Sequence, residues 1–231
     1  MPRGIRAALI LGALTLPGLQ AASFTFNAVD SGWYQSSGMN SQDLAIPSMN
    51  YFAGEFPIGN GFNYHDFFVF NISGLSGTIL SATLTIDNGG EGAVVGGPVT
   101  FNVSSVSDST ASIESNVMSN TIYSELASGT SYGSQSGIAG PGNVVINLNA
   151  DALNALASAG SGFVFGGHIT PIGDGANHYL FNNSFIDGDP NPVVQLSIVT
   201  SSTATPEPAS FALLGCGLAG FGLLARRRAR S

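Results

Sequence analysis

The chain has no lysine or arginine between Ala7 and Ala225. Its six basic residues are all arginines near the two ends, against fourteen acidic residues, and the formal net charge is −8. A segment whose only basic side chains are histidines repels phosphate backbones, which excludes nucleic acid as a partner. Without lysine or arginine salt bridges, its stability must come from apolar burial and backbone hydrogen bonds.

Cysteine is almost as scarce, because Cys216 is the only one. A single cysteine excludes an intrachain disulfide. A domain without disulfides must be held together by its hydrophobic core.

Catalytic motifs are also missing. The chain contains no His-Glu-x-x-His, Cys-x-x-Cys or P-loop pattern, and no Gly-x-Ser-x-Gly elbow on a strand-to-helix turn. His65 and Asp66 are neighbours, so on a strand they point to opposite faces. His168 and His178 flank a loop that carries Asp174, and the spacing leaves open whether they converge. We therefore predict a protein that is not an enzyme and needs no cofactor.

The N-terminus has the pattern of a secretory signal peptide. A short basic region, MPRGIR, precedes the apolar run AALILGALTLPGL, and Ala21 offers a small residue before a cut. The apolar run is too short to span a bilayer comfortably. Residues 1–21 are therefore predicted to be a signal peptide that export removes.

The C-terminus predicts a membrane span. Residues 209–225 are uncharged and apolar, close to the shortest length of about 17–25 residues that crosses a hydrocarbon core. The arginine cluster in residues 226–231 would hold that end on the cytoplasmic side. Residues 201–208 are the predicted linker. We expect an exported protein, anchored at first in the inner membrane.

This tail resembles the PEP-CTERM sorting signal of exported bacterial proteins. It has the Pro-Glu-Pro triplet, the apolar span and the terminal arginines in that order, in residues Pro206, Glu207, Pro208, Arg226, Arg227 and Arg228. The resemblance implies handling by a membrane exosortase that cuts near the triplet. It also implies a place at the cell surface or outside the cell of a bacterium that makes exopolysaccharide.

The middle of the chain, residues 22–200, has a β pattern. In ILSATLTID, residues Leu80, Ala82, Leu84 and Ile86 alternate with polar residues and are expected to share one face. VTFNVSS alternates in the same way, and HDFFVFNI is apolar on both faces, as in a central covered strand. One helix is predicted near residues 149–160, capped by Asn149. These features predict an all-β, antiparallel β-sandwich, jelly-roll-like, with one short helix.

The segment FFVFNISGLSGTILSATLTI resembles part of secreted jelly-roll modules of the DNRLRE type, some of which bind carbohydrate. The matching residues mark core positions: Phe68, Phe70, Ile72, Leu75, Ala82, Leu84 and Ile86. The resemblance implies a fold, and it only suggests a function.

Two ligand hypotheses follow from side-chain chemistry. Sugar binding needs exposed aromatic rings, and the candidates are Trp33, Tyr34, Tyr51, Tyr64, Tyr123, Tyr132 and Tyr179. Trp33 and Tyr34 are preferred, because they lie between small polar residues in SGWYQSSG, where exposure is plausible. Asp187, Asp189 and Asn191 alternate like the start of a calcium loop, although Pro192 replaces its glycine. The alternative for these three is a turn between two strands.

The favoured function is a non-catalytic surface or matrix protein, sorted by its tail and associated with exopolysaccharide or biofilm. The alternative is a carbohydrate-binding module for a specific glycan. A glycan hydrolase or lyase is the third alternative.

Overall fold

The computed structural model of the chain describes residues 19–41, 51–55, 62–88, 97–115, 117–172, 178–181 and 193–203, with scattered positions between 214 and 228. The chain divides into two compact units, residues 21–201 and the two ends, 1–20 and 202–231. We call residues 21–201 the sandwich domain. The elements that the structure describes from residue 19 to residue 203 are, in chain order, β1 (Leu19–Gln35), β2 (Ala53–Glu55), β3 (Asn63–Asn71), β4 (Thr78–Ile86), β5 (Val99–Ser105), α1 (Thr110–Ile113), α2 (Asn120–Ser128), β6 (Ser131–Ile138), β7 (Val144–Asn147), α3 (Ala150–Ser158), β8 (Gly162–Thr170), β9 (His178–Leu180) and β10 (Val194–Thr203).

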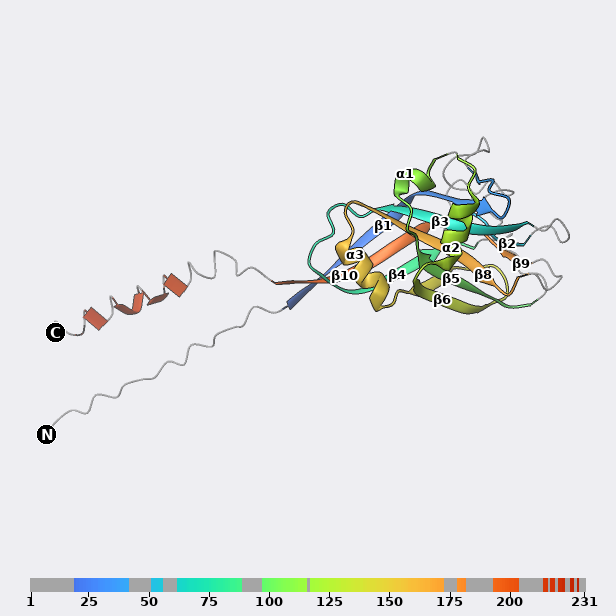
Figure 1. The fold of residues 1–231 in the computed structure, drawn as a ribbon. Coiled ribbons are helices and arrows are strands. Elements are labelled where there is room, and N and C mark those ends of the chain that lie inside the picture. Colours follow the sequence, from blue (N-terminus) through green and yellow to red (C-terminus); the bar gives the residue numbers. More distant parts are fainter. Residues whose placement is uncertain are drawn as a thin grey trace. The chain divides into compact units, whose positions relative to one another are not determined.

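The strands form one continuous sheet in the order β6-β5-β8-β3-β1-β10-β4-β7, with β2 beside β3 and β9 beside β2 (Figure 1). β1 serves both halves of this sheet, because it adjoins β10 and also pairs antiparallel with β3 from Ala28 to Gln35. The register with β3 shifts between Ala28 and Asp30, and such a bulge bends a strand. The sheet therefore folds into two layers. The first layer is β6, β5, β8, β3 and the second half of β1, and the second layer is the first half of β1 with β10, β4 and β7.

The two ends of the sheet meet where β6 approaches β7. The backbone N–H of Asn149 donates to the Tyr132 carbonyl at 2.8 Å, and its side-chain amide donates to the Ser131 carbonyl at 2.7 Å. A Cβ on Gly133 would lie 2.8 Å from Ile146, so a glycine allows this close approach. The sheet is therefore nearly closed, and the predicted all-β, antiparallel, jelly-roll-like sandwich is confirmed.

The main core fills the space between the two layers. Phe68 and Phe165 come from the first layer, and Leu84 and Leu196 from the second, and all four are fully buried. Of the predicted core positions, Phe68, Phe70, Ile72, Ala82, Leu84 and Ile86 are buried, and Leu75 packs against the core with partial burial. The core positions that the resemblance marked in β3 and β4, and the alternation of Ala82, Leu84 and Ile86 in β4, thus agree with the inward face.

Leu80 is the exception, because the prediction that it shares the face of Ala82 is wrong. Its side chain is 54% exposed. In the pairing of β4 with β10, Ser81 lies opposite Val199 but Ile79 lies opposite the next residue, Thr200. Leu80 is therefore the extra residue of a bulge, and Ile79 packs against the core in its place.

A second apolar cluster lies on the other side of the first layer, under α1 and α2, which lie near β3 in Figure 1. Phe67 and Val69 of β3 pack there against Ile113 of α1 and Ile122 and Leu126 of α2. The prediction that β3 is covered on both faces is confirmed. Neither α1 nor α2 was predicted from the sequence. Each begins after a serine N-cap, and the Ser119 hydroxyl accepts from the Ile122 N–H at 3.1 Å.

The predicted helix is α3. Its N-cap is Asn149, whose side-chain oxygen accepts from the Ala152 N–H at 3.0 Å. Ala152 and Leu156, four residues apart, bury one face against the core.

Candidate functional site

Most of the predicted sorting residues lie outside the described part of the chain. These are Pro206, Glu207, Pro208 and Arg227. Arg226 and Arg228 are helical and exposed. Among the positions described, no helix combines the length and the apolar character that a membrane crossing requires. The span expected over residues 209–225 stays a prediction.

Trp33 and Tyr34 are buried, so the exposure expected for these two rings is not found. Both lie in the second half of β1, which pairs with β3. Tyr34 is 0% exposed, and its hydroxyl donates to the Ile113 carbonyl at 2.9 Å. Trp33 is 8% exposed and packs edge-on against Tyr64 at a ring separation of 5.0 Å. Both residues pair with β3 on one flank, and they point to opposite faces of the sheet. On one face α1 covers Tyr34, and on the other face Tyr64 packs against Trp33.

A cluster of aromatic rings surrounds Tyr64 instead. Phe52 packs edge-on against Tyr64, also at 5.0 Å, and stacks on Tyr179 at 5.4 Å. The Gln35 side-chain amide donates to the Tyr64 hydroxyl at 2.8 Å. Tyr64 and Tyr179 are half-buried, so these two rings carry the exposed aromatic surface of the cluster. Phe52, Tyr64 and Tyr179 come from three different strands or their flanks, which is why no single sequence segment identified the cluster.

Asp66 of β3 is a buried carboxyl on the inner face. Its side chain is 0% exposed, and neither oxygen makes a hydrogen bond of regular geometry with a described residue. Burial raises the pKa of Asp66 well above its ordinary value, and the Phe52 backbone N–H opposes this shift only in part. No lysine or arginine exists between Ala7 and Ala225 to neutralise this carboxylate. The folded domain therefore favours the protonated acid.

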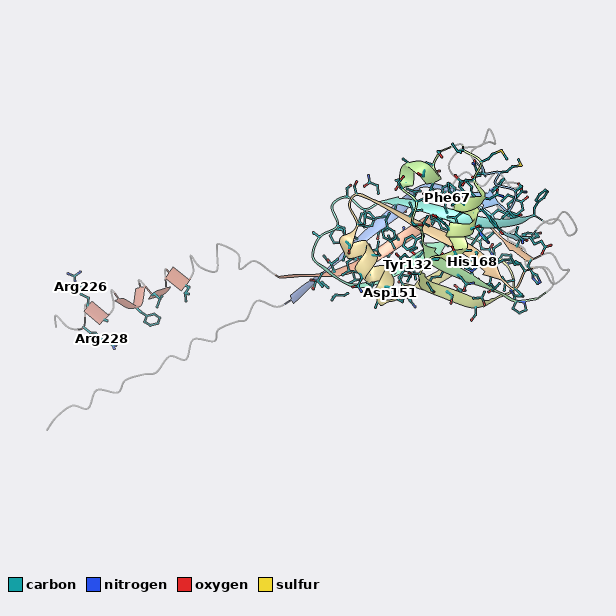
Figure 2. All side chains as sticks on the ribbon, in the orientation of Figure 1. Phe67, Tyr132, Asp151, His168, Arg226 and Arg228 are labelled. Carbon is teal, nitrogen blue, oxygen red and sulfur yellow. The ribbon has the colours of Figure 1, made fainter. Side chains whose placement is uncertain are left out.

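His65 points to the opposite face and meets α2. Its Nδ1 lies 2.7 Å from the Tyr123 carbonyl oxygen, and its ring stacks on the Tyr123 ring at 4.0 Å. His168 of β8, labelled in Figure 2, has its ring centre 5.7 Å from that of His65. Burial lowers the pKa of His65 to about 4, the Tyr123 hydrogen bond opposes this, and the nearby His168 lowers it further. Burial also lowers the pKa of His168.

The histidine pair was not predicted from the sequence, where His168 was related only to His178 across the loop between them. His178 lies on β9, which pairs with β2, and its side chain is 1% exposed. Asp174 lies outside the described residues. The signal that could have suggested the pair is that His65 and His168 each lie within a strand rather than in a loop.

The calcium hypothesis concerns residues that lie outside the described part of the chain, namely Asp187, Asp189 and Asn191. Within the described residues, no group of three or more His, Cys, Asp or Glu side chains could hold a metal ion. Calcium binding stays a prediction.

One cavity of about 320 Å³ opens between the β3–β4 turn and the end of α3. Its walls are mostly small or apolar, including Leu75, Ile79, Leu156 and Gly160, and none of the described residues that line it is titratable. The described lining includes two serine hydroxyls, Ser73 and Ser161, but no acid or base that could activate them.

The architecture described so far is that of a β-sandwich domain followed directly by a C-terminal targeting segment. Residues 204–228 match the PEP-CTERM protein-sorting motif. The chain therefore carries the sorting motif of exported proteins that are directed to the cell envelope and handled by an exosortase. The motif starts at the residue after the end of β10, Thr203. A comparison with curated proteins found no match. The resemblance of the sandwich domain to DNRLRE modules stays a prediction.

Proposed function

We propose that the protein is a non-catalytic component of the cell surface or extracellular matrix, associated with exopolysaccharide or biofilm. The observation that carries this proposal is the position of the sorting motif. It begins directly after the last strand, so a cut near Pro206–Pro208 would leave every described strand of the sandwich intact. The partners in this proposal are the exosortase and the membrane, and then extracellular polysaccharide.

The chemistry of the domain supports a non-catalytic role. Asp66 is sealed inside the sandwich, and the His65 ring is stacked under Tyr123. General acid–base catalysis needs a titratable group within hydrogen-bond reach of a substrate proton, and neither of these groups is placed for that. The acidic surface, without lysine or arginine between Ala7 and Ala225, suits a secreted protein that stays soluble beside other polymers.

The test of sorting is the mass of the mature C-terminus. The protein is expressed in an exosortase-containing host and in the same host without the exosortase gene. We expect a chain that ends near Glu207 in the first host and a chain that retains Arg230 in the second. Replacing Pro206 and Pro208 with alanine should prevent the cut, whereas Ser202→Ala, outside the motif, should not. An uncut chain in the first host would refute exosortase processing.

A second candidate function is glycan binding, which the cluster around Tyr64 favours. Aromatic rings that are half exposed beside polar groups are the usual platform for sugar rings. Tyr64 and Tyr179 have that character, with Gln35 and Ser37 adjacent. A glycan array with the wild-type protein tests this. Specific binding that Tyr179→Ala removes, and that Tyr123→Phe on α2 retains, would favour this candidate. An array without any specific signal would refute glycan binding and leave the matrix role as the remaining candidate.

A further inference from the structure

We propose that His65 and His168 form a binding site for a divalent transition-metal ion such as Zn²⁺ or Cu²⁺, on the α2 side of the first layer. Its two histidines lie on β3 and β8 and are not among the residues of the calcium hypothesis. It is also independent of the sorting motif.

The two imidazoles lie side by side on neighbouring strands. The antiparallel ladder of β3 and β8 includes the pair Asp66 and Gly167, and one step further along it brings His65 opposite His168. Residues that face each other across such a ladder share a face of the sheet. Their ring centres are 5.7 Å apart, with an angle of 63° between the ring planes. Two imidazoles on one tetrahedral ion, with metal–nitrogen bonds of about 2.0–2.1 Å, have ring centres roughly 5 Å apart. The observed separation of the two ring centres is therefore close to the one that a shared ion requires.

The nitrogen atoms of His65 are in the right state for a ligand. Nδ1 lies 2.7 Å from the Tyr123 carbonyl oxygen, which can only accept, so Nδ1 carries the proton. Nε2 then carries the lone pair, and the structure gives it no hydrogen bond to a described residue. A metal-binding histidine typically donates its other ring N–H to a carbonyl or carboxylate in this way. The Tyr123 carbonyl therefore holds His65 in a ligand-competent tautomer.

His168 supplies the second nitrogen. Its Nδ1 is buried and has no hydrogen-bond partner among the described residues, although the whole side chain is only partly buried. A buried imidazole nitrogen without a partner destabilises the folded state, and a bound ion would remove that cost. Burial lowers the pKa of both histidines, which favours the neutral imidazole that a metal ligand must be.

Oxygen ligands are available beside the pair. Asn63 lies two residues before His65 on the same face of β3, and its Oδ1 is buried without a partner among the described residues. Asn102 of β5 lies opposite His168. Two imidazoles with amide oxygens and water suit Zn²⁺, Cu²⁺ or Ni²⁺ better than Ca²⁺ or Mg²⁺. Because only two strong ligands contribute, we expect an affinity in the micromolar range rather than the nanomolar range.

The experiment titrates the purified protein, without a polyhistidine tag, with zinc chloride at neutral pH. Calorimetry measures the affinity, and side-chain NMR follows the three histidines separately. We expect one ion per chain and shifted imidazole signals for His65 and His168 only. His168→Ala should weaken zinc binding by at least about tenfold. This variant removes a partly exposed side chain, so the fold should survive.

The matched control is His178→Gln, which removes the third imidazole from a different strand. It should retain the zinc affinity of the wild type. If that variant does not fold, the His178 signal in the wild-type spectrum serves as the control and should stay unshifted. The proposal fails if zinc leaves the imidazole signals of His65 and His168 unchanged, or if His168→Ala binds zinc as tightly as the wild type. It also fails if Ca²⁺ shifts the same two signals with the affinity of Zn²⁺.

Discussion

Gly166 should be essential for stability because α2 packs its backbone directly on this residue. A Cβ at this position would lie 2.8 Å from Leu126 Cα and 2.9 Å from Leu126 C, and closer still to the Leu126 carbonyl oxygen. The φ angle of Gly166 is not in the left-handed region, so alanine would suffer from the contact and not from backbone strain. Gly166→Ala therefore tests the docking of α2 alone.

The size of the stability loss follows from the packing contacts and the hydrogen bond that α2 would lose. Optimal contact between carbon atoms is about 3.5–4.0 Å, so α2 would have to retreat by roughly 1 Å at Leu126. That retreat loosens the packing of Ile122 and Leu126, which are 5% and 0% exposed. It also strains the hydrogen bond from the Ser104 hydroxyl to the Leu126 carbonyl, now 2.9 Å long. Overpacking together with a weakened buried hydrogen bond should lower the free energy of unfolding by about 2–4 kcal/mol.

The assay is urea unfolding followed by the fluorescence of Trp33, the only tryptophan of the chain. Gly160→Ala is the matched control, because a Cβ there meets nothing within 4 Å and its φ is not in the left-handed region. It should leave stability unchanged or raise it by less than about 1 kcal/mol. If Gly166→Ala proved as stable as Gly160→Ala, α2 would not be docked as described, and the cover over His65 would be wrong with it.

Three further changes have defined outcomes. Burial raises the pKa of Asp66 above its ordinary 3.8, so the folded state binds this proton more tightly than the unfolded chain. The wild type should therefore lose stability as the pH rises above 3.8. Asp66→Asn should remove this part of the pH dependence and be more stable than the wild type at neutral pH, as urea titrations over a pH series with EDTA present would show. Tyr34→Phe should cost about 0.5–1.5 kcal/mol in the same assay, because it removes the 2.9 Å hydrogen bond to the Ile113 carbonyl, and an unchanged midpoint would contradict that bond. Asn149→Ala removes both the cap of α3 and the bond to Ser131, so thermal melting should show a loss of at least about 1 kcal/mol, whereas Asn154→Ala on the exposed face of α3 should show almost none.

Strand periodicity predicted much of the fold, for a physical reason. In β4 and β5 one face meets the core and the other meets solvent, so apolar and polar residues alternate at the period of the strand. β3 lies between the main core and the α2 cluster, so both of its faces are apolar, as its sequence indicated. The cap of α3 was equally readable, because Asn149 bonds to a residue only three positions away.

The wrong or missing predictions share one cause, because contacts between residues distant in the sequence determine the structure at each of these positions. Leu80 points outward because the partner strand β10 is out of step by one residue at that point. Tyr34 is buried because α1, distant in sequence, covers it, and Trp33 is buried because it packs against Tyr64 of β3 on the opposite face. The helix α2 is amphipathic over only two turns, and its stability depends on docking against Phe67 and Val164.

The sequence alone determined the sorting motif of this protein and the class of its fold. Both depend on local patterns, since a sorting motif is a contiguous run of residues and a strand shows its faces in every second side chain. Only the tertiary structure decided which polar groups meet. It brought His65 beside His168, buried Asp66 without a cation, and gathered Phe52, Tyr64 and Tyr179 from separate strands. Sheet order and register make those encounters, and no spacing along the chain encodes them.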